Sequence, residues 1–184
     1  MGPSNTHNSL GAFLAHTYTD LELKNESVGY SLWSGRVGEN RFAVHCLAEW
    51  SLEREQRERI LDTYHDLSGA KLCALPALQS CSSFESHVLL VEEWVVGTLW
   101  SGAVVSRLTA LQCTVELCDV LAELHEMDIA HGGVNPRNLL VEDETGRLRL
   151  LNTLCWSRLE EPRKEDDLRD ALTLLKFHLS DEEQ

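Results

Sequence analysis

The sequence has little positive charge: 16 Lys and Arg stand against 30 Asp and Glu, and the net charge is −14 over 184 residues. Proteins that bind nucleic acids need a basic surface to neutralise phosphates, and anionic membranes attract basic segments. The sequence also lacks an apolar run long enough to cross a bilayer, and its first residues lack the charged-then-apolar pattern of a secretory signal. We therefore expect a protein that binds neither nucleic acid nor a membrane.

Paired cysteine motifs are also missing. Six cysteines occur, at positions 46, 73, 81, 113, 118 and 155, and none forms a C-x-x-C pair. Without a secretory signal, such cysteines are typical of small buried apolar side chains in a reducing compartment. We expect an intracellular protein, cytoplasmic or nuclear, that has no metal site.

Alternation of apolar and polar residues predicts β-strands in the first half of the chain. Three short antiparallel strands are expected at about 20–25, 30–37 and 41–47, with a hairpin turn at 38–40. Residues 1–10 are polar and are predicted to be disordered. This part of the chain is therefore expected to form a small antiparallel sheet.

A helix is predicted after these strands, over residues 51–69. Ser51 is a suitable N-cap, and Gly69 stands where a C-terminal glycine cap belongs. Two further strands are predicted within 75–81 and 86–96, and the second is nearly continuously apolar, as a buried strand should be.

The second half of the chain is predicted to be mainly helical. Helical spacing indicates a long helix over 109–127 and an amphipathic helix over about 165–179, with a β-hairpin over 138–152 between them. The order of these elements predicts an α+β fold with two lobes, residues 11–96 and residues 97–184.

The stretch "LHEMDIAHGGVNPRNLLVEDETGRLRLLN", residues 124–152, resembles the catalytic loop and following hairpin of the protein kinase-like superfamily. His131, Pro136 and Asn138 stand where that family has them, and "RFAVHCL" is similar to its third strand. The resemblance implies a small antiparallel β-sheet N-lobe with one helix and a truncated, mainly helical C-lobe. Asp167 falls at the position of the family's aspartate in the helix after the activation segment.

The residues that phosphoryl transfer needs are replaced in this alignment. Gly133 stands at the position of the catalytic aspartate, Asn152 at that of the metal-binding aspartate, and His45 at that of the lysine that pairs with phosphates. The glycine-rich cover is also missing, and Tyr30 stands at one of its glycine positions. Of the two metal ligands only Asn138 survives, and Mg²⁺ prefers carboxylates. We therefore expect no bound cofactor, neither ATP nor a metal ion.

The resemblance implies a vestigial nucleotide site made of His45, Glu58, Asn138 and Asn152. Glu58 is the best candidate for the helix glutamate that the family pairs with its lysine, with Glu55 and Asp62 as alternatives. A His45–Glu58 contact is expected to hold the helix. His131 is expected to be a structural residue, hydrogen-bonded to backbone near Asn152.

These losses predict a catalytically inactive pseudokinase that acts as a protein-binding scaffold or regulator. The partner is expected to be another protein, such as a kinase or a second copy of the chain. On the last helix Leu168, Leu172, Leu175 and Leu179 are predicted to pack inward, whereas Leu174 and Phe177 are predicted to be uncovered and to offer an interaction surface.

Two alternatives remain open at the level of sequence. One is a nucleotide sensor that binds ATP without turnover. The other is an atypical phosphotransferase on the same fold, with Glu142, Asp143 or Asp128 as substitute acidic groups.

Overall fold

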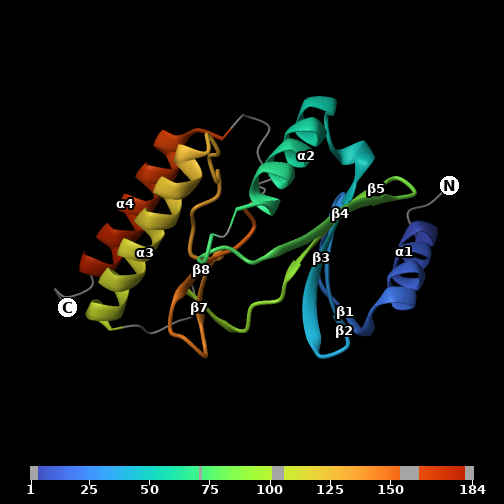
Figure 1. Cartoon of the computed structure of the whole chain (residues 1–184), viewed down its shortest axis with the longest axis horizontal. Coiled ribbons are helices and arrows are strands. Elements are labelled where there is room, and N and C mark those ends of the chain that lie inside the picture. Colours follow the sequence, from blue (N-terminus) through green and yellow to red (C-terminus); the bar gives the residue numbers. More distant parts are fainter. Residues whose placement is uncertain (1–3, 71, 101–105, 154–161, 181–184) are drawn as a thin grey trace. The chain divides into compact units, whose positions relative to one another are not determined.

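The computed structural model describes residues 4–70, 72–100, 106–153 and 162–180 (Figure 1). The chain divides into two compact units: residues 1–64 with 77–94, and residues 65–76 with 95–184. The predicted lobes, 11–96 and 97–184, differ from this division mainly in residues 65–76, which belong to the second unit. None of the described helices is long and apolar enough to cross a membrane.

The first unit contains a five-stranded antiparallel sheet whose strand order is β1-β2-β3-β5-β4. All five strands overlap the segments predicted to form strands, although β4 begins and ends three residues later than the predicted 75–81. Their bounds are Thr19–Ser27 for β1, Tyr30–Val37 for β2, Asn40–Ala48 for β3, Leu78–Phe84 for β4 and His87–Glu93 for β5.

A tight turn joins β2 to β3 where the sequence predicted a hairpin. Val37 pairs with Asn40, so two residues form the loop, and Gly38 has φ 61°. Glycine adopts this left-handed conformation without steric cost, which suits it to two-residue hairpins.

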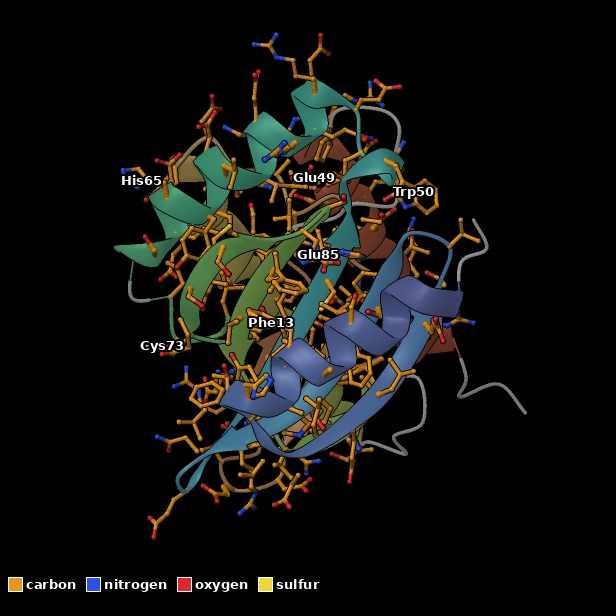
Figure 2. All side chains as sticks on the ribbon, turned by 90° about the vertical axis from the view of Figure 1, so that its right-hand side faces the viewer. Phe13, Glu49, Trp50, His65, Cys73 and Glu85 are labelled. Atoms are coloured by element: carbon orange, nitrogen blue, oxygen red, sulfur yellow. The ribbon has the colours of Figure 1, made fainter. Side chains whose placement is uncertain are left out.

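One face of the sheet is covered by helix α1 (Ser4–Thr17). Leu10 and Leu14 are buried in a cluster that also contains sheet residues such as Val44. Figure 2 shows α1 lying across the sheet, and Phe13 stacks on Phe84 with ring centroids 3.7 Å apart. The prediction of disorder for residues 1–10 is therefore wrong for the described residues from Ser4 onward. The segment is mostly polar, and its two leucines stabilise a helix only because they are buried against the sheet.

A short 3₁₀ helix, η1 (Glu49–Ser51), precedes helix α2 (Arg54–Ser68). The helix thus begins after the predicted N-cap, because the Ser51 hydroxyl donates to the carbonyl of Ala48 (2.6 Å) rather than capping α2. Ile60 and Leu67 are the buried apolar residues of α2.

The second unit combines a three-stranded antiparallel sheet with two long helices. The strands are β6 (Gly97–Leu99), β7 (Leu139–Glu142) and β8 (Leu148–Leu150), in that order across the sheet. The helices α3 (Arg107–Glu126) and α4 (Lys164–Ser180) pack side by side (Figure 1).

Two local features position strand β6 and the first turn of helix α3. Gly97 is required in β6, because a Cβ there would lie 2.3 Å from the carbonyl oxygen of Val141 on β7. Ser106 caps α3, since its side chain accepts a hydrogen bond from the backbone N–H of Thr109.

The inward face of α4 differs from the predicted one. Asp167 and Ala171 are buried, whereas Leu168 and Leu172 are 48% and 57% exposed. Leu174, predicted to be uncovered, and Leu175, predicted to pack inward, are both half-buried, and the side chain of Leu179 lies outside the described part of the chain. The buried Asp167 sets the rotation of the helix, so residues four and seven positions later turn inward and the neighbouring leucines turn outward. The side chain of Phe177, the other predicted interaction residue, lies outside the described part of the chain.

Candidate functional site

The segment between α3 and β7 is anchored by one buried carboxylate at the start of α4. Oδ2 of Asp167 accepts a hydrogen bond from the backbone N–H of His131 (2.7 Å), and Oδ1 accepts one from that of Gly132 (2.7 Å). His125 Nε2 lies 3.0 Å from Oδ2, on the last turn of α3. Hydrogen bonds to an ionised acceptor are the strong kind, and the first turn of a helix favours negative charge. Asp167 therefore joins α3, the loop and α4.

His131 is fully buried and bonded to backbone at both ring nitrogens. Its Nδ1 lies 3.2 Å from the backbone nitrogen of Gly133, and its Nε2 lies 3.0 Å from the carbonyl oxygen of Leu151. An N–H can only donate and a carbonyl can only accept, so the ring carries its proton on Nε2. This geometry agrees with the predicted structural role of His131.

Asn138 and Asn152 meet in a neutral amide pair. Nδ2 of Asn152 donates to Oδ1 of Asn138 (2.9 Å), and Nδ2 of Asn138 donates to the carbonyl oxygen of Gly133 (2.7 Å). Asn152 has φ 56°, a left-handed conformation that asparagine tolerates better than most residues. The structure thus brings together three of the positions that the sequence singled out in this loop.

These residues do not fit the Mg²⁺ ion that the fold implies. Mg²⁺ dehydrates reluctantly and is usually held by carboxylates together with substrate phosphates. Asn138 Oδ1, the oxygen that a cation would need, already accepts from the neighbouring amide N–H. Among the described residues no group of three or more His, Cys, Asp and Glu could hold a metal ion. We therefore derive no chemical step through a metal at this position.

Gly133 is buried and has no side chain that could accept a proton. Its backbone N–H faces His131, and its carbonyl oxygen accepts from the amide groups of Asn135 (2.8 Å) and Asn138 (2.7 Å). The position that the alignment assigns to a catalytic base therefore contributes only backbone hydrogen bonds to the loop.

In the first unit, His45 lies in a polar cluster on the sheet face opposite α1. Its Nε2 is 3.0 Å from Oε1 of Glu92 on β5, and its Nδ1 is 2.9 Å from the hydroxyl of Tyr30 on β2. The side chain is 4% exposed. Because a carboxylate can only accept, the Nε2 proton of a neutral ring points at Glu92, and Tyr30 donates to Nδ1.

This cluster offers no net positive charge. Burial raises the pKa of the Tyr30 hydroxyl, and the charge of Glu92 raises that pKa further, so Tyr30 remains protonated. The Glu92 carboxylate lies against the His45 ring, so the pair has no net positive charge to offer a polyphosphate, whereas the lysine that the family has at this position attracts one.

The predicted contact between His45 and Glu58 is wrong. Glu58 lies on α2 with its side chain 57% exposed, and it pairs with Arg54 one turn earlier (2.8 Å). Both ring nitrogens of His45 are bonded to other residues. Strand pairing brings the actual partner close: Leu90 pairs with His45 across β3 and β5, and Glu92 is two residues further along the same face.

The candidate substitute acids are engaged elsewhere. Glu142 pairs with Arg149 in the β7–β8 sheet (3.0 Å), and Asp143 is exposed at the turn after β7. Asp128 pairs with Lys164 (2.6 Å) and its side chain is 94% exposed. A hydrogen bond from Lys164 and its charge hold the pKa of Asp128 below the ordinary value.

Comparison with known proteins gives a likeness of structure alone. No family model matches the sequence, and no curated protein matches it. The PknI kinase domain of Mycobacterium tuberculosis matches with a TM-score of 0.64 and 16% identity, over 75% of this chain and 58% of that chain. Rad53, solved in complex with AMP-PNP, matches with a TM-score of 0.66 and 15% identity, over 86% of this chain and 48% of that chain.

The chain therefore spans about half to three fifths of the length of these kinase structures. The protein has a protein kinase-like fold: α+β, with a small antiparallel sheet and one inserted helix in its N-terminal part and a shortened, mainly helical C-terminal part.

Proposed function

We propose that this protein is a catalytically inactive kinase-like module, a pseudokinase, whose function is to bind and regulate another protein. The observation that carries the proposal is the neutral pair of Asn138 and Asn152 beside Gly133. In kinase chemistry these positions hold the metal ion and accept the substrate proton. Here all three are hydrogen-bonded to one another or to the loop backbone.

Two further features support inactivity. His45 is paired with Glu92, so the strand-three position offers no net positive charge, which disfavours nucleotide phosphates. Glu142 and Asp128 are paired with Arg149 and Lys164, which disfavours an atypical phosphotransferase that would use them as acid or base. A base of this kind would contribute about 10²–10⁴ to the rate.

A reducing compartment fits the state of the cysteines. Those in the described ranges are all free, and Cys73 and Cys118 are exposed. Burial raises the pKa of Cys46 to about 12 and that of Cys113 to about 11, so both thiols stay protonated and unreactive. We therefore propose an intracellular location and a structural role for the buried cysteines.

Calorimetric titration of the whole chain with ATP tests the proposal, with and without Mg²⁺. We expect no saturable binding under either condition. An active kinase domain measured beside it confirms that the assay detects nucleotide.

Two results would contradict the proposal. Saturable binding that Asn152→Ala removes would make the protein a nucleotide sensor. Turnover of ATP that Asn138→Ala removes would make it an enzyme.

A further inference from the structure

The solvent side of α3 carries an apolar stripe in addition to the face that packs inward. The stripe consists of Leu108, Leu111, Val115, Cys118 and Ala122, all exposed. The spacing alternates between three and four residues, so these side chains line one face of the helix over about four turns. Leu108 is 67% exposed and Val115 is 61% exposed.

The stripe is separate from the core of the second unit. The inward face of α3 is formed by other residues of the helix: Ala110, Cys113, Leu117, Val120, Leu121 and Leu124. A surface helix normally has one apolar face, whereas a helix that is apolar on two sides is usually covered on both. Among the residues that the structure describes, the stripe is thus an unpartnered helix face, and contiguous exposed apolar surface of this kind marks interaction sites.

Charge along the stripe is mainly negative. Asp119 and Glu123 are exposed along one edge, and Glu126 lies at its C-terminal end. Within α3, Arg107 is the only Lys or Arg, at the first position of the helix. The edge therefore attracts positive charge over most of its length.

We propose that the α3 stripe binds an amphipathic helix of another protein, with apolar residues at the same three-and-four spacing and lysine or arginine along its flank. Helices recognise one another in this way when anchors at such spacing meet a complementary apolar face. A second copy of this chain fits less well, because it would bring its own Asp119 and Glu123 edge and a net charge of −14. This inference rests on the proposed function, since it specifies the partner of the binding module.

Binding of synthetic helical peptides to the whole chain, measured by fluorescence anisotropy, tests this inference. The probe has about three heptads, with leucine at the two core positions and lysine at the flanks. One control peptide has glutamate at the flanks, and a second keeps lysine but has serine at the core positions. We expect both controls to bind at least about tenfold more weakly than the probe.

Variants of the chain locate the binding site. Val115→Glu is expected to weaken probe binding at least about tenfold, because it places a charge within the apolar contact. The matched control is Leu172→Glu on α4, at a residue 57% exposed, with an expected change below about twofold. Asp119→Lys is expected to weaken binding of the lysine peptide and to strengthen binding of the glutamate peptide. All variants are first compared with the unaltered chain by circular dichroism and thermal unfolding.

Several outcomes would overturn the inference. They are no binding of the probe, equal binding of the serine control, or equal loss in Leu172→Glu. A dimer of the chain alone that Val115→Glu dissociates in sedimentation would show that the occupant is a second copy. None of these outcomes bears on nucleotide binding, so the ATP titration tests the proposed function independently.

Discussion

Two polar clusters hold the same loop in the second unit, and they differ in charge. Asp167 is a buried carboxylate that accepts from the backbone of His131 and Gly132. Asn138 and Asn152 are a neutral pair that bonds the loop through the carbonyl oxygen of Gly133. Both clusters satisfy their hydrogen bonds, yet only the first contains an ionised group.

This difference in charge distinguishes groups that stabilise the loop from groups that could take part in phosphoryl transfer. A buried carboxylate that receives several N–H donors stabilises a loop strongly, and Asp167 does so from the start of α4. An amide pair stabilises the loop as well, but it offers neither charge for a metal ion nor a base for a proton. The loop can therefore keep a kinase-like shape without the groups that phosphoryl transfer requires.

Removing the charge of Asp167 is expected to have the largest effect on the stability of the fold. In Asp167→Asn the new NH₂ group faces an N–H donor, since both carboxylate oxygens accept hydrogen bonds. We expect the free energy of unfolding to fall by about 3 kcal/mol, measured by urea denaturation. The control Asp143→Asn removes a charge from an exposed position and should change stability by less than about 0.5 kcal/mol. Equal losses in the two variants would mean that Asp167 does not anchor the loop.

Adding a charge to the amide pair tests whether its neutrality is what prevents Mg²⁺ binding. Asn152→Asp sets a carboxylate oxygen against Asn138 Oδ1, so two acceptors repel each other and attract a cation. We expect stability without metal to fall by about 1 kcal/mol, and affinity for Mg²⁺ to rise at least about tenfold. Calorimetric titration with Mg²⁺ measures the gain.

A matched variant distinguishes the pair from a general effect of charge. Asn135→Asp adds the same charge to the same loop, and it also removes one amide donor to Gly133. Its Mg²⁺ affinity should remain that of the unaltered chain. A similar gain in both variants would show that the Asn138–Asn152 geometry is not what limits metal binding.

The smallest expected effect concerns Asp128 and Lys164, beside the Asp167 cluster. Lys164 lowers the pKa of Asp128, so this carboxyl stabilises the fold above its unfolded pKa, and the contribution is lost as pH falls through the lowered folded value. In Lys164→Met the pKa of Asp128 should rise toward its ordinary value, as measured by NMR titration. Lys176→Met, an exposed change on the same helix, should leave that pKa unchanged. An unshifted pKa in Lys164→Met would contradict the assigned cause.

Much of the fold could be predicted from the sequence because its signals are local. Strand alternation located β1 to β5, and the loop motif located Gly133, Asn138 and Asn152. The failures involve contacts between distant segments. Residues 4–10 are too polar to predict a helix until the sheet face that receives Leu10 and Leu14 is known. The partner of His45 was missed because Glu92 is adjacent only after β3 pairs with β5.

The sequence by itself determined which functional groups are present at the loop: a glycine and an asparagine where a kinase-like site would have aspartates, beside the retained Asn138. No arrangement of the backbone can supply a charge that the side chains lack. The tertiary structure alone decided how those groups are used. Burial of Asp167 set the rotation of α4 and exposed Leu168 and Leu172, and the packing of the loop brought Asn138 and Asn152 within hydrogen-bond distance. Such contacts depend on the relative position of segments far apart in the chain, which periodicity along one segment does not specify.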